Sequence, residues 1–187
     1  MKFEKTIDNI RIVENFVDSN DLQDVDSFLQ TWIPTDKDFF VVPIVNNKTK
    51  NFCLKYPKIA HILAEDYYRV EIEREYLNNP SPVIWRTGAF MEEHVDLMGL
   101  MNEKDYDISE HPDVELNDYT LAAIIYINDA YEGGELCFPD FDLQIKPKAG
   151  TLILFPSNSD FKHSVNEVKS GNRFTVATWY KVKENNV

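Results

Sequence analysis

His94 and Asp96 stand two positions apart in the stretch WRTGAFMEEHVD, and their side chains could share a bound metal. If residues 93–97 form an extended strand, positions i and i+2 project from the same face, so the two tips can converge. An imidazole beside a carboxylate suits a divalent transition metal. An isolated His-x-Asp pair also occurs at exposed strand ends, so the prediction of a metal site needs further ligands from elsewhere in the chain.

Two further histidines follow, His111 and His163. His111 begins a second His-x-Asp, but Pro112 cannot donate to a sheet ladder, and its neighbours are acidic and loop-like. His163 lies between two predicted strands, which would hold it rigidly. Together with His94 and Asp96 it would complete the ligand set of two histidines and one carboxylate that non-haem Fe(II) oxygenases use, with coordination positions left open.

Arg173 begins a predicted apolar strand, ten residues after His163. A guanidinium is permanently charged, and inside an apolar barrel it requires an anionic partner. The predicted strand runs TLILFP and FTVATW contain no acidic residue that could neutralise it from inside. A bound dicarboxylic acid, with one end on the metal and the other on Arg173, would supply that partner. The alternative is a surface arginine after the turn at Gly171.

Composition sets the context of these residues. The 187 residues fit one domain, 1–187. Nineteen Lys and Arg stand against thirty-two Asp and Glu, a net charge of −13, which argues against nucleic acid as a partner. Cys53 and Cys137 are far apart and predict neither a disulfide framework nor a thiolate zinc site. With no apolar run of signal-peptide or membrane-spanning length, we expect a cytoplasmic protein that does not bind membranes. Nothing indicates its oligomeric state.

Residues 1–82 are predicted to form a support region of helices and strands. Strands are expected at 9–17 and 39–45, where β-branched and aromatic residues are dense. Helical spacing predicts one helix from Ser19 or Asn20 and a second from about Pro57 to Leu77. The second helix is expected to bury a stripe made up of Ile59, Ile62, Leu63, Tyr67 and Val70. His61 is expected to be an ordinary helix residue and not a ligand.

Residues 83–182 have a different sequence pattern, in which short apolar runs are separated by Gly, Pro, Asn and Asp. Runs such as YTLAAIIYIN and NRFTVATWYKV predict an all-β barrel or jelly roll, so the fold class is mainly β with flanking helices. The glycines of YEGGELCFP are expected to serve a tight turn and no chemistry. The acidic segment 97–118, which contains Met98, Met101 and Tyr106, is expected to be a loop, either a lid over the site or a solvated connection.

Four ordered pieces of sequence match a known family. They are W..G.....HVD, YINDAYEGGELCFP, PKAG followed by LILF, and H.......GNR.....W, in which Gly171, Arg173 and Trp179 follow His163 by eight, ten and sixteen residues. Over about residues 83–180 the chain resembles the 2-oxoglutarate, Fe(II)-dependent dioxygenases, specifically their prolyl 4-hydroxylase-like branch. The resemblance implies a double-stranded β-helix of the jelly-roll, cupin-like type.

The resemblance also implies roles for individual residues. Fe(II) would be held by His94, Asp96 and His163, and 2-oxoglutarate would chelate it through its 1-carboxylate and 2-keto oxygens. The 5-carboxylate would pair with Arg173, and Tyr126 would offer its phenol to the same group unless it is simply a core aromatic. Thr175, two residues after Arg173 on the same strand face, is a further candidate contact.

The implied activity is an enzyme that couples oxidative decarboxylation of 2-oxoglutarate with O2, giving succinate and CO2, to hydroxylation of a C–H bond. A peptidyl proline is the first choice of substrate, Trp179 a candidate substrate contact, and ascorbate a supporting reductant. Trp85 and Met91 stand where related hydroxylases usually carry tyrosines, and Lys181 where a histidine is usual, so the substrate wall differs. Alternatives are another amino-acid side chain, a small molecule, or a non-catalytic jelly-roll module that binds a metal or partner.

Overall fold

Two main antiparallel sheets, a two-stranded ribbon and two α-helices form the described part of the computed structural model, which covers residues 4–7, 9–33, 39–43, 46–73, 80–96 and 120–183. The expected loop at 97–118, together with His111, lies outside these residues. Among the described residues, no helix is long and apolar enough to cross a membrane.

The larger sheet has seven strands, and the N-terminal region contributes three of them. In spatial order they are β1 Glu4–Ile7, β2 Ile10–Val13, β10 Leu152–Pro156, β6 Thr120–Tyr126, β13 Arg173–Lys181, β4 Pro82–Trp85 and β3 Phe39–Val41. The strands expected at 9–17 and 39–45 are therefore present as β2 and β3 but are shorter than predicted. Because β2 pairs with β10 and β3 with β4, the support region extends the sheet that carries Arg173.

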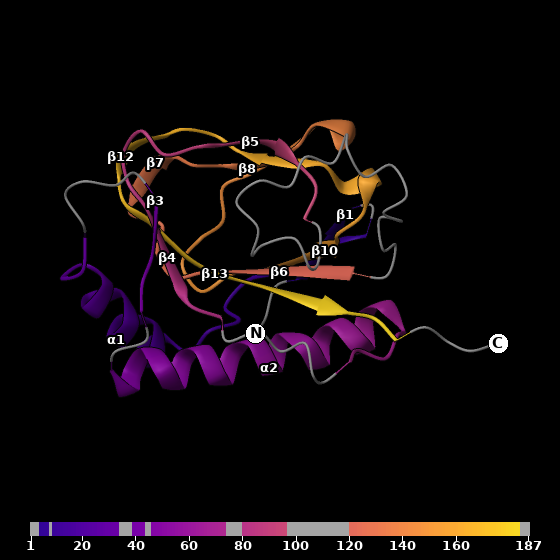
Figure 1. Ribbon diagram of the computed structural model, residues 1–187, viewed down its shortest axis with the longest axis horizontal. Helices are drawn as coiled ribbons and strands as arrows, with labels where there is room; N and C mark the ends of the chain where they lie inside the picture. Colours follow the sequence, from indigo (N-terminus) through magenta and orange to yellow (C-terminus); the bar gives the residue numbers. More distant parts are fainter. Residues whose placement is uncertain are drawn as a thin grey trace, which may run out of the picture.

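The smaller sheet lies over one face of the larger one (Figure 1). Its four strands are β5 Met91–His94, β11 His163–Val165, β8 Leu136–Phe138 and β9 Leu143–Ile145. A two-stranded ribbon adds β12 Val168–Gly171 and β7 Tyr131–Gly133, and two 3-10 turns, η3 Pro139–Phe141 and η4 Ser159–Phe161, lie in connections. The chain passes between the sheets after β4 and after β10, which confirms the predicted mainly β, double-stranded β-helix fold with flanking helices.

The two helices cover the opposite face of the larger sheet (Figure 1). Helix α1 spans Ser19–Leu29, and its N-terminus is capped by the carboxylate of Asp18, which accepts a hydrogen bond from the Asn20 amide at 2.9 Å. Helix α2 spans Asn47–Tyr68, so the predicted bounds of Pro57 and Leu77 are wrong. The Asn46 side chain caps it ten residues earlier than predicted, and Arg69, in the left-handed conformation, ends it.

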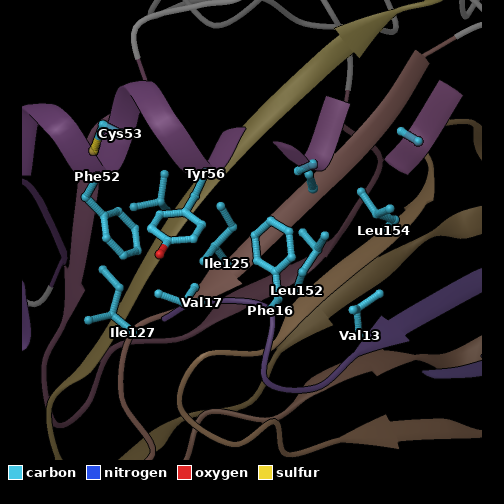
Figure 2. Close-up of a cluster of buried hydrophobic side chains, with 14 of the residues drawn as sticks. Val13, Phe16, Val17, Phe52, Cys53, Tyr56, Ile125, Ile127, Leu152 and Leu154 are labelled. Carbon is cyan, nitrogen blue, oxygen red and sulfur yellow. The ribbon is translucent and has the colours of Figure 1, made fainter. Parts of the chain in front are cut away.

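The buried stripe of α2 also differs from the predicted one, because Ile62 is 64% exposed. Phe52 and Tyr56 instead pack against the sheet together with Cys53, Ala60 and Ala64. Figure 2 shows Phe52 and Tyr56 pointing from the helix toward the strands that carry Ile125 and Leu152. His61 is buried within this helix, 3.3 Å from the Glu65 carboxylate and beside the Tyr180 ring, as expected for a structural histidine.

A second apolar cluster fills the space between the two sheets. It includes Tyr126, Phe138, Phe155 and Val165, with Trp85 and Tyr131 at the edge nearest Arg173. Because strand residues alternate between faces, Arg173, Thr175, Ala177 and Trp179 of β13 share this inner face, whereas Phe174, Val176 and Tyr180 belong to the helix-side cluster. Every sequence-predicted site residue of β13 therefore faces the space between the sheets.

Candidate functional site

His94 and His163 lie opposite each other on neighbouring strands. His94 ends β5, His163 begins β11, and the two are direct antiparallel partners with ring centroids 4.3 Å apart. The register shifts between this pair and the next, Met91 with Val165, so β5 contains one extra residue there. Such a bulge redirects a strand locally, and it brings His94 to the inner face in step with His163.

Asp96 lies two residues beyond the end of β5, so the predicted strand through residue 97 does not extend to it. Its backbone is held instead by Ser157, whose hydroxyl donates to the Asp96 carbonyl. The Asp96 carboxylate is 3.6 Å from Nε2 of His94 and 3.5 Å from Nε2 of His163. One donor atom from each of the three residues lies within 4.8 Å of the others, which brings the predicted metal ligands together.

Backbone carbonyls orient both imidazoles. Nδ1 of His94 is 2.8 Å from the carbonyl oxygen of Glu92, and Nδ1 of His163 is 3.1 Å from that of Phe161. A carbonyl can only accept, so each Nδ1 bears a proton, and Nε2 of the neutral ring is the atom left to bind a metal. In metal sites, the hydrogen bond from the ring nitrogen that does not bind the metal, here Nδ1, usually fixes the tautomer and direction of the histidine.

The three side chains also shift one another's pKa values. Burial would raise the pKa of Asp96, but the hydrogen bond with His94 and the charges of both histidines lower it overall. Burial would lower the pKa of His94, but Asp96 and the Glu92 carbonyl raise it overall. Burial dominates at His163 and lowers its pKa. The cluster is thus a charged carboxylate between two imidazoles, and a cation that displaces protons from them would be favourably bound.

The site has two walls, one on the smaller sheet with His94, Asp96 and His163, and one on the inner face of the larger sheet. Arg173 belongs to the second wall, at the start of β13, and only 1% of its surface is exposed. Its Nη2 donates to the Tyr126 hydroxyl at 3.0 Å, and its guanidinium carbon lies 4.9 Å from the Trp85 ring and 5.0 Å from the Tyr126 ring. Its Nε and Nη1 have no hydrogen-bond partner among the described residues. A buried cation with two unused donors is costly unless an anion binds there.

The remaining predicted residues are divided between the two walls. Thr175 is buried beside Arg173, and its hydroxyl accepts a hydrogen bond from the Trp85 indole at 3.3 Å. The Trp179 indole N–H lies toward Asp96 and lowers the pKa of that carboxyl, although the contact falls outside hydrogen-bond geometry. Lys181, at the end of β13, forms a salt bridge of 3.4 Å with Glu73.

Two residues near Arg173 are absent from the sequence prediction. Asn128 bridges the backbone on either side of Arg173, since its amide donates to the carbonyl of residue 172 at 2.8 Å and its oxygen accepts from the amide of residue 174 at 2.9 Å. Tyr131 is buried against Arg173, and its hydroxyl has no hydrogen-bond partner among the described residues. The only sequence signal was their place in YINDAYEGG, between Tyr126 and the glycine turn.

The glycine turn makes room for this wall. Gly133 and Gly134 both have positive φ, of 72° and 63°. A Cβ at Gly133 would overlap the carbonyl oxygen of Glu167, and one at Gly134 would lie 3.0 Å from Cδ of Arg173. The turn is structural, as predicted, but it also allows the backbone to approach the arginine closely.

The inner face of the larger sheet is partly exposed between the two walls. Ile124 and Ala177 lie on the two central strands of the larger sheet, yet each is partly exposed while its chain neighbours are buried. Both face the smaller sheet, between the end of β13 that carries Arg173 and the end that carries Trp179. A central strand is solvent-accessible on its inner face only where side chains from the other sheet do not cover it.

The donor atoms fit an Fe(II) ion and a dicarboxylate cosubstrate. Two imidazole nitrogens and one carboxylate, without a thiolate, suit an iron site with open positions better than a closed structural zinc site. The unpartnered N–H groups of Arg173 suit one carboxylate. Burial raises the pKa of Tyr126, so its phenol keeps its proton and can donate to that same carboxylate.

Comparison with solved structures agrees with this architecture. The viral collagen prolyl hydroxylase of Paramecium bursaria Chlorella virus-1, solved as a 2OG complex, gives a TM-score of 0.62 at 16% identity and covers 94% of this chain and 97% of its own. A prolyl hydroxylase of Trichoplax adhaerens, solved with a hypoxia inducible factor peptide, gives 0.62 at 14% identity, with 92% and 83% covered. At such low identity these likenesses establish the fold.

Sequence comparison identifies the family. Prolyl 3-hydroxylase 2 of Homo sapiens is 37% identical over 92 residues, which cover 46% of this chain and only 13% of that protein. The family model described as the 2OG-Fe(II) oxygenase superfamily matches residues 83–181, more than half of the chain. This chain therefore belongs to the 2OG-Fe(II) oxygenase superfamily.

Proposed function

We propose that this chain is an Fe(II)- and 2-oxoglutarate-dependent dioxygenase that hydroxylates a peptidyl proline. The observation that carries the proposal is that a cluster of metal-ligand atoms and a buried arginine with unpartnered N–H groups both face the space between the two sheets. The cluster of His94, Asp96 and His163 offers ligand atoms to a cation, whereas Arg173 offers N–H groups to an anion. A dicarboxylate bound to iron at the cluster could also pair with Arg173.

The two histidines and Asp96 would hold Fe(II) on one face, through Nε2 of each imidazole and the carboxylate. Their direction is set before binding, because Nδ1 of each histidine is already occupied by a backbone carbonyl. Arg173 and Tyr126 would bind the 5-carboxylate of 2-oxoglutarate, and the Trp85 ring would keep the guanidinium in position through its π face.

The bound iron, 2-oxoglutarate and O2 supply the oxidising chemistry, in which the cosubstrate is converted to succinate and CO2 and a substrate C–H bond is hydroxylated. The chain's own contribution is orientation and exclusion of water. Buried aromatic residues, among them Phe138 and Phe155, pack against the His163 ring and leave it only 4% exposed on its side chain. A dry site strengthens the carboxylate contact with Arg173.

Proline as the substrate is supported by the names of the relatives. The curated relative is a prolyl 3-hydroxylase, and the two solved structures are a collagen prolyl hydroxylase and a prolyl hydroxylase with a bound peptide. A peptide partner also suits a site that opens between two sheets. Because this chain spans 13% of the curated relative, neither the peptide sequence nor the choice between C3 and C4 of the ring is transferred.

The test is a turnover assay with Fe(II), 2-oxoglutarate and O2, with and without ascorbate, which we propose as the reductant that keeps the iron active. Wild-type protein is expected to form succinate, and proline-rich peptides are expected to gain one oxygen by mass spectrometry. Hydrolysis and chromatography against 3- and 4-hydroxyproline standards then identify the ring position. Oxygen gain on a different side chain or a small molecule would correct the substrate, and absence of succinate with every substrate would favour a non-catalytic binding module.

A further inference from the structure

Three hydrogen-bond donors near the glycine turn have no acceptor. They are the hydroxyl of Tyr131 and the Nε and Nη1 groups of Arg173, none of which has a partner among the described residues. Both side chains are buried, with 5% of Tyr131 and 1% of Arg173 exposed. A buried donor without an acceptor costs about 1–3 kcal/mol, so three such donors in one place indicate a group that is yet to bind.

The two side chains meet over Gly134. A Cβ built on this glycine would lie 3.0 Å from Cδ of Arg173 and 3.2 Å from Cε2 of Tyr131, so both border the same small space. Burial raises the pKa of the Tyr131 hydroxyl, and the charge of Arg173 together with a polar contact from that residue, which falls outside hydrogen-bond geometry, lowers it by less. The phenol therefore stays protonated and can act as a donor.

The other contacts of Tyr131 fix its ring and leave its hydroxyl unused. Lys146 lies over the ring at 4.5 Å, and its ammonium donates to the backbone carbonyls of Tyr131 and Gly133 at 2.7 and 3.1 Å. Gly171 pairs with Tyr131 across the β7–β12 ribbon. A ring held from several sides loses little conformational freedom when its hydroxyl binds a ligand, which favours affinity.

We propose that Tyr131 is a third donor to the distal carboxylate of the cosubstrate, beside Arg173 and Tyr126. This inference rests on the proposed function, because it assigns Tyr131 to the same cosubstrate site. A carboxylate has two oxygens that accept about four hydrogen bonds, which matches the two free N–H groups of Arg173 and the two phenols. The site would then bind a dicarboxylate through an arginine flanked by two tyrosines.

The test removes a single oxygen atom. Tyr131→Phe keeps the ring, the Lys146 contact and the β7–β12 pairing, so it should fold. Binding is measured calorimetrically with Mn(II) in place of Fe(II), so that no turnover occurs. Loss of one hydrogen bond to a charged group should weaken 2-oxoglutarate binding roughly 10- to 100-fold. Mn(II) affinity should be unchanged, as should affinity for oxalate, which has the chelating end but no distal carboxylate.

Two other tyrosines supply matched controls. Tyr126→Phe removes the phenol that already contacts Arg173 and should also weaken 2-oxoglutarate binding. Tyr180→Phe removes a buried phenol on the helix side, which donates to the Pro57 carbonyl at 2.7 Å, and should lower the unfolding midpoint without changing 2-oxoglutarate affinity. The ligand-free Tyr131→Phe protein should show no loss of unfolding midpoint, because the Tyr131 hydroxyl forms no hydrogen bond of good geometry with any described residue.

The outcomes separate the two proposals. If wild-type protein binds Mn(II) but not 2-oxoglutarate, the proposed function fails and this inference fails with it. If wild-type and Tyr131→Phe bind 2-oxoglutarate equally while Tyr126→Phe binds it weakly, the proposed function stands and Tyr131 is no ligand. A ligand-free Tyr131→Phe protein as destabilised as Tyr180→Phe would show that the phenol already has a structural partner, which also overturns the inference.

Discussion

The two walls of the site differ in how their buried charges are balanced. On the smaller-sheet side, the Asp96 carboxylate is balanced by His94 and His163 at 3.6 and 3.5 Å, and backbone carbonyls orient both rings. On the larger-sheet side, Arg173 contacts one phenol and two aromatic faces, and no carboxylate of the described residues pairs with it. Within the part of the chain that the structure describes, the first wall is nearly neutralised without a ligand, whereas the second retains a cation without a carboxylate partner.

This difference indicates which wall depends on its ligand. The three-residue cluster can exist metal-free, because its partners hold one another and share protons. No described residue supplies an acceptor to Nε or Nη1 of Arg173, so we expect a bound anion to complete the environment of this side chain. We therefore expect substitutions on the two walls to affect metal affinity, cosubstrate affinity and ligand-free stability in different combinations.

The largest effect is expected from Asp96→Ala. It removes the only carboxylate of the cluster and leaves two imidazoles, so the fall in Mn(II) affinity should exceed the roughly 10- to 100-fold that follows loss of an outer-sphere partner. Fe(II)-dependent succinate formation should be abolished. Metal titration followed by calorimetry measures the first quantity and product analysis the second.

His111→Ala is the control for this prediction. His111 belongs to the competing His-x-Asp motif and lies outside the described residues. Metal affinity and turnover should stay near the wild-type values in this variant. An inactive His111→Ala protein beside an active Asp96→Ala protein would place the metal at the other motif.

Arg173→Met should separate cosubstrate affinity from stability. Without the charge-assisted contact, 2-oxoglutarate binding should weaken by about 2–5 kcal/mol, or thirtyfold and more, while Mn(II) affinity is retained. Methionine fills a similar volume without a buried unpaired charge, so the ligand-free unfolding midpoint should be equal or higher. The rise in midpoint that 2-oxoglutarate gives the wild type should disappear. A destabilised ligand-free variant would show that Arg173 has a structural anion partner instead.

The sequence identified the charged residues of these walls better than it predicted the backbone features that position them. His94, Asp96, His163 and Arg173 are named by residue type and spacing, and the structure brings the first three together. The cross-strand pairing of the histidines depends on a bulge in β5, and no local pattern encodes it. The sequence shows Tyr131 only as the first residue of the glycine-turn segment YEGGELCFP, and a lone aromatic residue there carries no periodic signal about which wall it faces.

The helix α2 shows the same limit in the fold. Proline favours the first turn of a helix, so the sequence favours a start at Pro57, yet the helix begins ten residues earlier, at Asn47, where the Asn46 side chain caps it. The buried face then follows from packing on the sheet, where Phe52 and Tyr56 contact the core and Ile62 does not. Packing against the sheet therefore decides which of several possible apolar stripes of the helix is buried.

The metal wall should also be the more sensitive of the two to pH. Asp96 and the Glu92 carbonyl together raise the pKa of His94 overall, so protonated His94 stabilises the metal-free fold below its unfolded pKa of about 6.5. That stability is lost as the pH rises through the folded value. A bound metal requires the neutral ring, so protons compete with the metal, and Mn(II) affinity should fall by up to about tenfold per pH unit below the folded pKa.

Calorimetric Mn(II) titrations between about pH 8 and pH 6 measure this dependence around the ordinary histidine pKa. Asp96 has a lowered pKa and stays charged throughout this range, so it should not contribute to the slope. The rise in unfolding midpoint that Mn(II) causes should shrink in parallel with the affinity. Affinity that is constant across the whole range would exclude His94 as a ligand.

The smallest effect is expected from Ser157→Ala, which tests how Asp96 is supported beyond the end of β5. The Ser157 hydroxyl donates to the Asp96 carbonyl and not to its carboxylate, so its loss changes position without removing a ligand. Because Asp96 lies outside the strand ladder, this contact should matter by about 1 kcal/mol, or roughly fivefold in Mn(II) affinity. Cosubstrate contacts with Arg173 should be unaffected, so oxalate and 2-oxoglutarate should weaken by the same small factor, if at all. A loss as large as that of Asp96→Ala would mean that the hydroxyl acts on the metal directly, whereas no change in metal affinity would show that the carboxylate is positioned by His94 and His163 alone.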